Sequence, residues 1–287
     1  MKNKNRTPVP NGILLVIGGK ENKGEEDAPS RKNPAGFLTR DILKTFGELI
    51  RKHNANIQVI TSGSSEGQET FEDYKKVFHE LGQEHVHHIH HGTREEVLND
   101  DCEKLVADGD AFFFAGGDQL VITSLYGGTP FLTQLKEKYI SKRLIVGGTS
   151  AGAMALSTPM IYAGNQEVQE VSGEIKVTTG LEFIRDVCVD THFVHRSRFV
   201  RLAQVIATNP GCLGLGIEED TAVIVRKGRQ CEVIGSGTVI VIKGFGITQS
   251  DMKSFAEKKP FSVRNLAVDI LAAGDTFEME QVNPPHL

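Results

Sequence analysis

The sequence lacks three features that would point to particular classes of protein. Its four cysteines, Cys102, Cys188, Cys212 and Cys231, are widely spaced and form no C-x-x-C pair, so we expect reduced, mostly buried thiols in a reducing compartment. No long run of Lys and Arg occurs, and the net charge is −5, so we expect no nucleic-acid partner. The first apolar run, 13–17, is too short for a signal-peptide core or a bilayer span. We therefore expect a cytoplasmic protein that does not bind membranes.

What the sequence contains is typical of one α/β domain. With 287 residues, of which 39% are hydrophobic and 24% charged, the chain can form a sizeable core. It has no internal repeat, linker or low-complexity segment. We expect a single domain, 1–287, with a β-rich extension over about 208–287.

Short apolar runs alternate with stretches of helical spacing up to residue 150. The expected strands are 13–17, 57–60, 86–91, 111–114 and 143–146, and the expected helices are 37–53, 68–81 and 95–107. This alternation predicts a mostly parallel sheet with helices on both faces, in three layers. Ligands bind beyond the carboxyl ends of such strands, and glycines follow several of them, at Gly18-Gly19, Gly63, Gly116-Gly117 and Gly148.

Beyond residue 150 the pattern changes to short strands joined by turns. We expect a loop or hairpin at 160–181, a helix at 197–207, and strands at 187–190, 213–217, 221–225, 230–234 and 238–242. These strands are expected to extend the sheet. The polar segment 20–34 is predicted to be a surface loop.

A G-x-S-x-G pattern lies at the end of one expected strand. In Gly147-Gly148-Thr149-Ser150-Ala151-Gly152-Ala153 the serine follows an apolar run and precedes another, which is typical of a nucleophile elbow. The small neighbours of Ser150 allow the strained turn, and the helix that follows would direct its N–H groups toward an oxyanion. The alternative is a glycine-rich turn that binds a phosphate or nothing.

A serine nucleophile needs a base, an orienting acid and an oxyanion hole. His192, at the end of an expected strand, is the preferred base, and His195 is the competing histidine. The acid is expected in Glu218-Glu219-Asp220, which also follows a strand. We favour Glu219, although position alone leaves the three carboxylates undecided. Glu167 and Glu170 are more distant candidates.

Two further motifs could bind substrate. In Gly116-Gly117-Asp118-Gln119 the Gly117 N–H could pair with the Ala151 N–H as an oxyanion hole, and Gln119 could bind an amide or carboxylate. The alternative is that these glycines only allow close packing. Arg196, Arg198 and Arg201 follow His192 closely. Guanidinium groups recognise carboxylates through paired hydrogen bonds, so we expect an acidic substrate.

Half of the ten histidines lie within seven residues, in the expected strand 86–91 or directly before it. They are His85, His87, His88, His90 and His91. No cysteine or carboxylate completes a ligand set at the spacing a metal site needs. We therefore expect an exposed strand end, no metal site and no cofactor.

Four motifs, far apart in the chain, occur in an order typical of one family. They are Ala115-Gly116-Gly117-Asp118-Gln119; the segment from Gly147 to Ala153; Asp190-Thr191-His192-Phe193 followed by Arg196, Arg198 and Arg201; and Gly216-Ile217-Glu218-Glu219-Asp220-Thr221-Ala222. With these motifs the chain resembles the cyanophycinases, in the serine peptidase family that also contains the α-aspartyl dipeptidases. The resemblance extends from the first expected strand to about residue 242. It implies a flavodoxin-like or class I glutamine amidotransferase-like fold and a homodimer.

The resemblance also implies roles for individual residues. A catalytic triad would consist of Ser150, His192 and Glu219, and the substrate would be cyanophycin, a polyaspartate with arginine linked to each β-carboxyl group, cleaved to β-Asp-Arg dipeptides. Asp190 and Gln119 would line the pocket, where Asp190 could receive the guanidinium of the substrate. Thr191 departs from the family pattern, since many members have glutamine there.

Two other functions remain open from the sequence. One is an aspartyl dipeptidase-like peptidase acting on short Asp-X peptides. The other is a non-catalytic binder of small anions that uses the glycine loops and the arginines.

Overall fold

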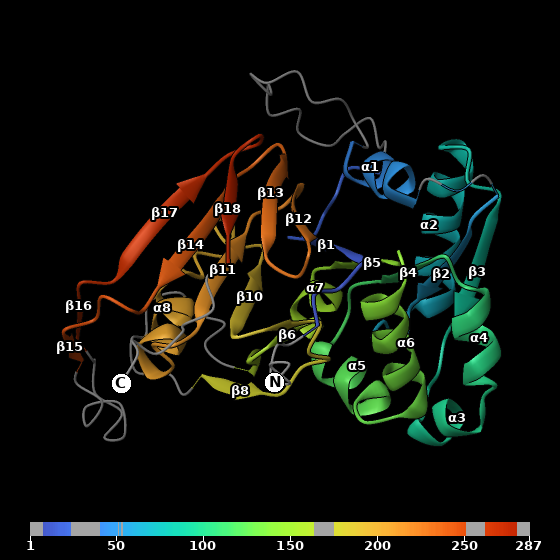
Figure 1. Cartoon of the computed structure of the whole chain (residues 1–287), viewed down its shortest axis with the longest axis horizontal. Helices are drawn as coiled ribbons and strands as arrows, with labels where there is room; N and C mark the ends of the chain where they lie inside the picture. Colours follow the sequence, from blue (N-terminus) through green and yellow to red (C-terminus); the bar gives the residue numbers. More distant parts are fainter. Residues whose placement is uncertain are drawn as a thin grey trace, which may run out of the picture.

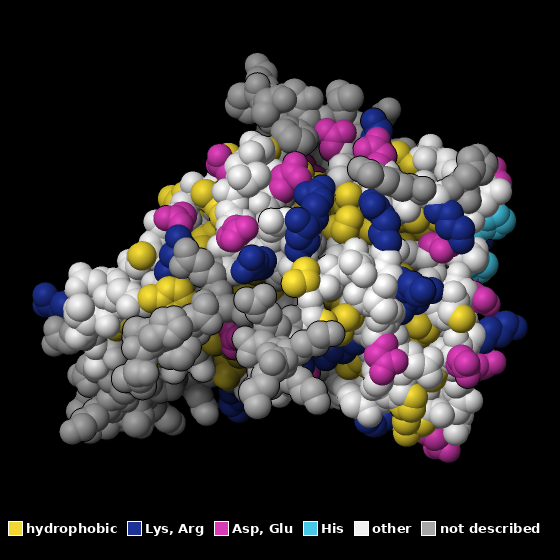
Figure 2. Space-filling model, in the orientation of Figure 1, with side chains coloured by type: hydrophobic (Ala, Val, Ile, Leu, Met, Phe, Trp, Pro, Cys, Tyr) yellow, Lys and Arg dark blue, Asp and Glu magenta, His cyan; other side chains and the backbone are white. Residues whose placement is uncertain are grey.

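Two large mixed sheets and the helices around them form the part of the chain that the structure describes (Figure 1). The structure is a computed structural model and describes residues 8–23, 41–50, 52, 54–163, 175–250 and 262–279. In these ranges no helix is long and apolar enough to cross a membrane. Figure 2 shows Lys and Arg side chains interspersed with Asp and Glu side chains over one face of the molecule.

The larger sheet contains the parallel strands that the alternating pattern predicted. It has eight strands in the order β18-β13-β12-β1-β5-β4-β2-β3. Its parallel half consists of β1 (Ile13–Ile17), β5 (Ile145–Thr149), β4 (Ala111–Phe114), β2 (Asn56–Ile60) and β3 (His85–Ile89). Strands β1 and β4 are entirely apolar because helices cover both of their faces, whereas the edge strand β3 carries three histidines, none of them buried.

Alternate residues of the parallel strands enter two separate cores. Leu15 and Phe113 pack with α1 (Asp41–Ile50) and α2 (Gly67–Glu80). Leu14, Phe112 and Phe114 belong to the larger core, which includes side chains of α5 (Gln119–Tyr126) and α6 (Pro130–Ser141). Figure 1 shows these two helix layers on opposite sides of the parallel strands.

The expected mostly parallel sheet is instead mixed, and the expectation that the strands beyond residue 150 extend it holds for only some of them. Antiparallel strands β12 (Thr221–Arg226), β13 (Gln230–Gly235) and β18 (Thr276–Glu278) extend the first sheet from β1. Six further strands form a separate sheet in the order β17-β14-β11-β10-β6-β9. Its strands are β17 (Ala267–Leu271), β14 (Val239–Lys243), β11 (Leu213–Ile217), β10 (Val187–Thr191), β6 (Ser157–Thr158) and β9 (Ile184–Arg185). Helix α8 (Phe199–Thr208) packs on this sheet.

Three local features bear on the sequence expectations: an expected helix is divided in two, an expected hairpin is present, and part of a predicted surface loop is buried. The helix expected at 95–107 is two helices, α3 (Arg94–Asn99) and α4 (Cys102–Asp108), because the Asp101 side chain caps a new helix start by accepting from the Lys104 N–H. The segment at 160–181 contains a hairpin, in which β7 (Met160–Ala163) pairs with β8 (Lys176–Thr178). In the predicted surface loop, Glu21 is buried, and 24–34 lie outside the described residues.

Turns between the two sheets bring distant strand ends together. The chain passes from β11 to β12 at residues 218–220, and from β13 to β14 at residues 236–238. The Asp220 N–H donates to the Gly19 carbonyl at 2.9 Å, and the His192 N–H donates to the Gly18 carbonyl at 2.9 Å. The carboxyl ends of β1, β5, β10 and β11 therefore meet at the boundary between the sheets.

Candidate active site

Ser150 occupies a sharp turn between β5 and the short helix α7 (Ala151–Ala155). Its φ of 52° and ψ of −116° are strained for a residue with a side chain. A Cβ atom on Gly152 would lie 2.1 Å from the Phe114 carbonyl oxygen, and one on Gly148 would lie 2.8 Å from the backbone of Gly152. Both glycines are needed because neighbouring backbone occupies the space that a side chain would fill.

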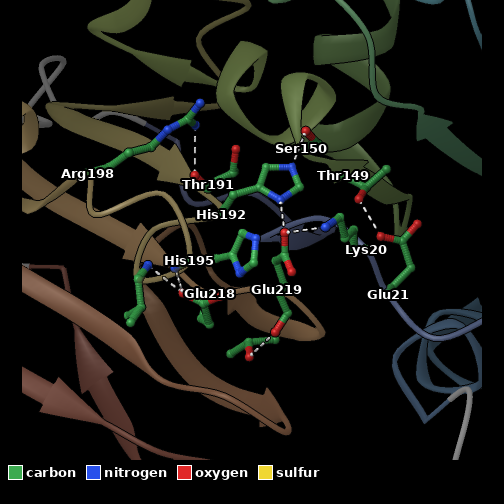
Figure 3. A network of polar contacts seen from close by, with 12 residues as sticks. Lys20, Glu21, Thr149, Ser150, Thr191, His192, His195, Arg198, Glu218 and Glu219 are labelled. Carbon is green, nitrogen blue, oxygen red and sulfur yellow. Dashed lines mark hydrogen bonds and ion pairs between the residues drawn. The ribbon is translucent and has the colours of Figure 1, made fainter. Parts of the chain in front are cut away.

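The imidazole of His192 lies between Ser150 and Glu219 (Figure 3). Its Nε2 atom is 2.9 Å from the Ser150 Oγ atom. Its Nδ1 atom is 2.7 Å from Oε1 of Glu219. Three residues from the ends of three strands thus form one hydrogen-bonded series, and the ring is buried.

The three adjacent carboxylates point in different directions and have different partners. Glu218 is buried and accepts from the backbone N–H groups of Val194 and His195. Asp220 accepts from the Asn22 N–H at 3.1 Å and from the Ser236 hydroxyl at 2.6 Å. Among the three, only Glu219 contacts His192.

The other histidine and carboxylate candidates have different surroundings. The His195 side chain is exposed, and its backbone N–H is held by Glu218. Glu167 and Glu170 lie outside the described residues.

The site is arranged so that the carboxylate is charged and the imidazole is neutral. Burial would raise the pKa of Glu219, but hydrogen bonds from His192 and Lys20 outweigh it and lower that pKa. Burial lowers the pKa of His192. The hydrogen bond to Glu219 raises it, and the nearby Arg196 lowers it again, so that it lies below the ordinary 6.5. A neutral imidazole beside a hydroxyl can act as a general base.

A cavity of about 430 Å³ opens beside Ser150. It is lined by Gly117, Gln119, Ser150, Ala151, Met154, Tyr162, Ala163, Thr191, His192, Arg196, Arg198 and Arg201. Most of the predicted site residues are in this set. Met154 of α7 and the hairpin residues Tyr162 and Ala163 were not predicted, since no motif marks them.

Gly117 and Ala151, the predicted oxyanion hole, both line this cavity with Ser150. Gly117 has φ of +132°, and a Cβ atom on it would lie 2.0 Å from the Gly63 carbonyl oxygen. A glycine is therefore required at this position. The Asp118 N–H donates to the same Gly63 carbonyl at 2.8 Å, which holds the loop in place.

Asp190 lies behind the cavity and not on its wall. The carboxylate is fully buried. Its two oxygens accept from Arg201 Nε at 2.7 Å and Nη2 at 2.5 Å, and from Arg198 Nη1 at 3.1 Å. The predicted contact with a substrate guanidinium does not fit this position, because the carboxylate is already bonded to these arginines.

The arginines themselves reach the cavity. Burial lowers the pKa of Arg198 to about 10 although Asp190 opposes the shift, so it remains a cation at neutral pH. Arg196 is exposed. Among the described residues, Asp190 is the one carboxylate paired with these three arginines, so the described wall of the cavity has an excess of positive charge.

Gln119 and Thr191 are uncharged polar residues that line the cavity, Gln119 with a hydrogen-bond partner in the protein and Thr191 without one among the described residues. The Gln119 Nε2 atom donates to the Ile161 carbonyl at 2.9 Å, which fixes the amide. The Thr191 hydroxyl is buried and has no hydrogen-bond partner within the described part of the chain. Buried hydroxyls without a partner are uncommon, which makes Thr191 a candidate for contact with a bound molecule.

A buried carboxylate that the sequence did not single out supports the serine turn. Glu21 accepts from the Thr149 hydroxyl at 2.6 Å (Figure 3). It also accepts from the Tyr74 hydroxyl. Burial, followed by the charge of Glu21, raises the pKa of Tyr74. The signal that could have identified Glu21 is its place four residues after the end of β1, in the region where the functional residues of a parallel sheet are commonly found.

The histidine-rich strand lies elsewhere. His91 is buried, with Nε2 2.9 Å from Asp100 and Nδ1 2.9 Å from the Tyr126 hydroxyl. His88 is 2.7 Å from the Thr61 hydroxyl and stacks on Phe71. No group of three His, Cys, Asp or Glu side chains in the described ranges could hold a metal ion.

Comparisons with known proteins agree with one another. The sequence model of peptidase family S51 matches residues 36–233. A cyanophycinase of Geminocystis herdmanii is 30% identical over 271 residues, 94% of this chain and 95% of that protein. A cyanophycinase of Nostoc sp. is 30% identical over 277 residues, 96% of this chain and 89% of that protein. The crystal structure of a peptidase from an acI-B1 Actinobacterium shares the fold, with a TM-score of 0.64 and 22% identity over 95% of this chain and 99% of that one.

Proposed function

The chain belongs to peptidase family S51, and on that basis we propose that it is a serine exopeptidase that hydrolyses the polyaspartate backbone of cyanophycin to β-Asp-Arg dipeptides. The main support is the hydrogen-bonded series Ser150, His192 and Glu219 at the edge of a cationic cavity. The relatives named cyanophycinase align with this chain over almost its whole length.

The first half of the reaction forms an ester on Ser150. The Oγ atom attacks the backbone carbonyl while His192 Nε2 takes its proton, and Glu219 holds the Nδ1 proton of the resulting imidazolium. The N–H groups of Gly117 and Ala151 stabilise the tetrahedral oxyanion. Collapse of this intermediate breaks the peptide bond, and His192 gives the proton to the leaving amine.

The second half restores the enzyme. Water enters in place of the amine, His192 removes its proton, and the hydroxide oxygen attacks the ester carbonyl. The ester C–O bond breaks, Ser150 regains its proton from His192, and the carboxylic acid product leaves. The two half-reactions use the side chains of Ser150, His192 and Glu219, the backbone N–H groups of Gly117 and Ala151, and one water molecule.

The cavity charge fits an acidic substrate. Arg196, Arg198 and Arg201 face the cavity and Asp190 neutralises one of their charges. The remaining positive charge would hold backbone or terminal carboxylates of polyaspartate. We also propose a cytoplasmic location and a homodimer, in line with the sequence expectations.

Incubation with purified cyanophycin and mass analysis of the products tests the proposal. We expect β-Asp-Arg as the main product, and loss of turnover by roughly 10³ to 10⁶ in Ser150→Ala. Asp-X dipeptides assayed in parallel separate a dipeptidase from a cyanophycinase. Absence of labelling of Ser150 by a fluorophosphonate would instead indicate a non-catalytic protein that binds small anions.

A further inference from the structure

Lys20 shares the acceptor oxygen that Glu219 offers to His192. The Lys20 Nζ atom lies 3.2 Å from Oε1 of Glu219. The same Oε1 atom is 2.7 Å from His192 Nδ1. Figure 3 shows the ammonium group and the imidazole approaching this oxygen from different sides.

The backbone holds Lys20 in this position. Lys20 follows Gly18 and Gly19 at the end of β1 and has φ of 44°. The Gly18 carbonyl accepts from the His192 N–H, and the Gly19 carbonyl accepts from the N–H of Asp220, the residue after Glu219. The segment that bears the lysine is therefore tied to the segments that bear the base and the acid.

We propose that Lys20 is a positioning residue which, by sharing the Oε1 atom of Glu219, limits how strongly that carboxylate stabilises a protonated His192. The proposal rests on the proposed function of Ser150, His192 and Glu219. Its consequence is that the imidazole remains a free base to lower pH than it would without the lysine.

The sign of the effect follows from the charges around the ring. Glu219 favours imidazolium, whereas Arg196 and Arg198 oppose it, and Lys20 acts by partly neutralising Glu219. Protonated His192 cannot accept the Ser150 proton, so activity falls as the pH drops through the pKa of His192. Removing Lys20 strengthens the effective charge of Glu219, raises that pKa and moves the acidic limb of the activity profile to higher pH.

The test is the pH dependence of Ser150 labelling by a fluorophosphonate, together with kcat/KM on cyanophycin. The variants are Lys20→Met, Lys20→Arg and, as a matched control, Lys44→Met, which removes a cation that pairs with Glu48 on α1. Methionine is unbranched, as lysine is, so the strain at a positive φ is unchanged. Melting temperatures check that the variants fold.

We expect Lys20→Met to raise the midpoint of the acidic limb by about half a pH unit, the size expected for an exposed charge a few ångströms away. At high pH its rate should stay within about threefold of wild type. Lys20→Arg and Lys44→Met should leave the limb unchanged.

Two results would overturn the inference. One is a pH profile of Lys20→Met whose acidic limb coincides with that of the wild-type protein. The other is a lower rate at all pH values with no shift, because a purely structural role would have that effect. Absence of labelling in the wild-type protein is a different failure, since it removes the proposed function and this inference with it.

Discussion

A Cβ atom on Gly19 would lie 2.5 Å from Cε1 and 2.6 Å from Nε2 of His192. Nε2 is the atom that faces the Ser150 hydroxyl. Gly19 also has φ of +98°, a conformation that side chains rarely adopt. The glycine after β1 therefore sets how close the backbone can come to the ring.

Gly19→Ala should inactivate the site by displacing the imidazole. We expect labelling of Ser150 by a fluorophosphonate to fall by about 100-fold or more, the usual result of moving a reacting group by an ångström. The matched control is Gly274→Ala, at φ of +92° with no atom within 4 Å of the added methyl group. It should lose about 1 kcal/mol of stability and keep the labelling rate. Equal labelling in both variants would show that the ring tolerates the methyl group.

Glu219→Gln should lower catalytic activity with little effect on stability, whereas Glu218→Gln should lower stability. Glutamine at 219 cannot stabilise the imidazolium, so kcat should fall by roughly 10³ to 10⁴ while the melting temperature changes little. Glutamine at 218 weakens the acceptor for the Val194 and His195 N–H groups and should cost about 1 to 3 kcal/mol of stability.

Steady-state kinetics and denaturant unfolding measure the two effects. If Glu218→Gln lost as much kcat as Glu219→Gln with normal stability, the assignment of the acid would be wrong.

Asp190→Asn should destabilise the protein by about 3 kcal/mol, because it leaves the partly buried Arg198 and Arg201 without a counter-charge. Urea unfolding measures this loss. The control is Glu232→Gln, which breaks the half-exposed pair with Arg226 and should cost less than about 1 kcal/mol. A similar loss in both variants would mean that Asp190 does not hold the cavity arginines.

Thr191→Val tests whether the unpartnered hydroxyl contacts substrate. Valine has nearly the same shape, so the protein should be as stable as wild type or more stable by about 1 kcal/mol. The KM for cyanophycin should rise by roughly fivefold to tenfold if the hydroxyl bonds to substrate. A loss of stability with unchanged KM would instead indicate a partner for the hydroxyl within the protein.

Much of the site could be predicted from strand ends. Ser150, His192 and Glu219 each follow an apolar run, and parallel strands present such positions at one edge. Lys20 and Glu21 follow an apolar run as well, but their segment contains many charges, which favoured a surface loop. The burial of Glu21 depends on Thr149 and Tyr74, which are distant in sequence.

The sequence could not predict which partners the side chains of the site face, or how the strands are divided between sheets. Asp190 was expected to bind a guanidinium group of the substrate, but it pairs with Arg198 and Arg201 of the protein itself. Two sheets instead of one arise because the chain crosses between them at residues 218–220 and 236–238. Turn residues are compatible with either topology, so the pattern of short strands does not distinguish them.

The sequence by itself determined the local features: the buried strands, the small residues around Ser150, and the polar residues that follow the strand ends. Only the tertiary structure decided which of Glu218, Glu219 and Asp220 meets His192. The physical reason is that these neighbours are chemically alike and differ in direction, and their directions depend on a turn held by Gly19, a residue about 200 positions away in the chain.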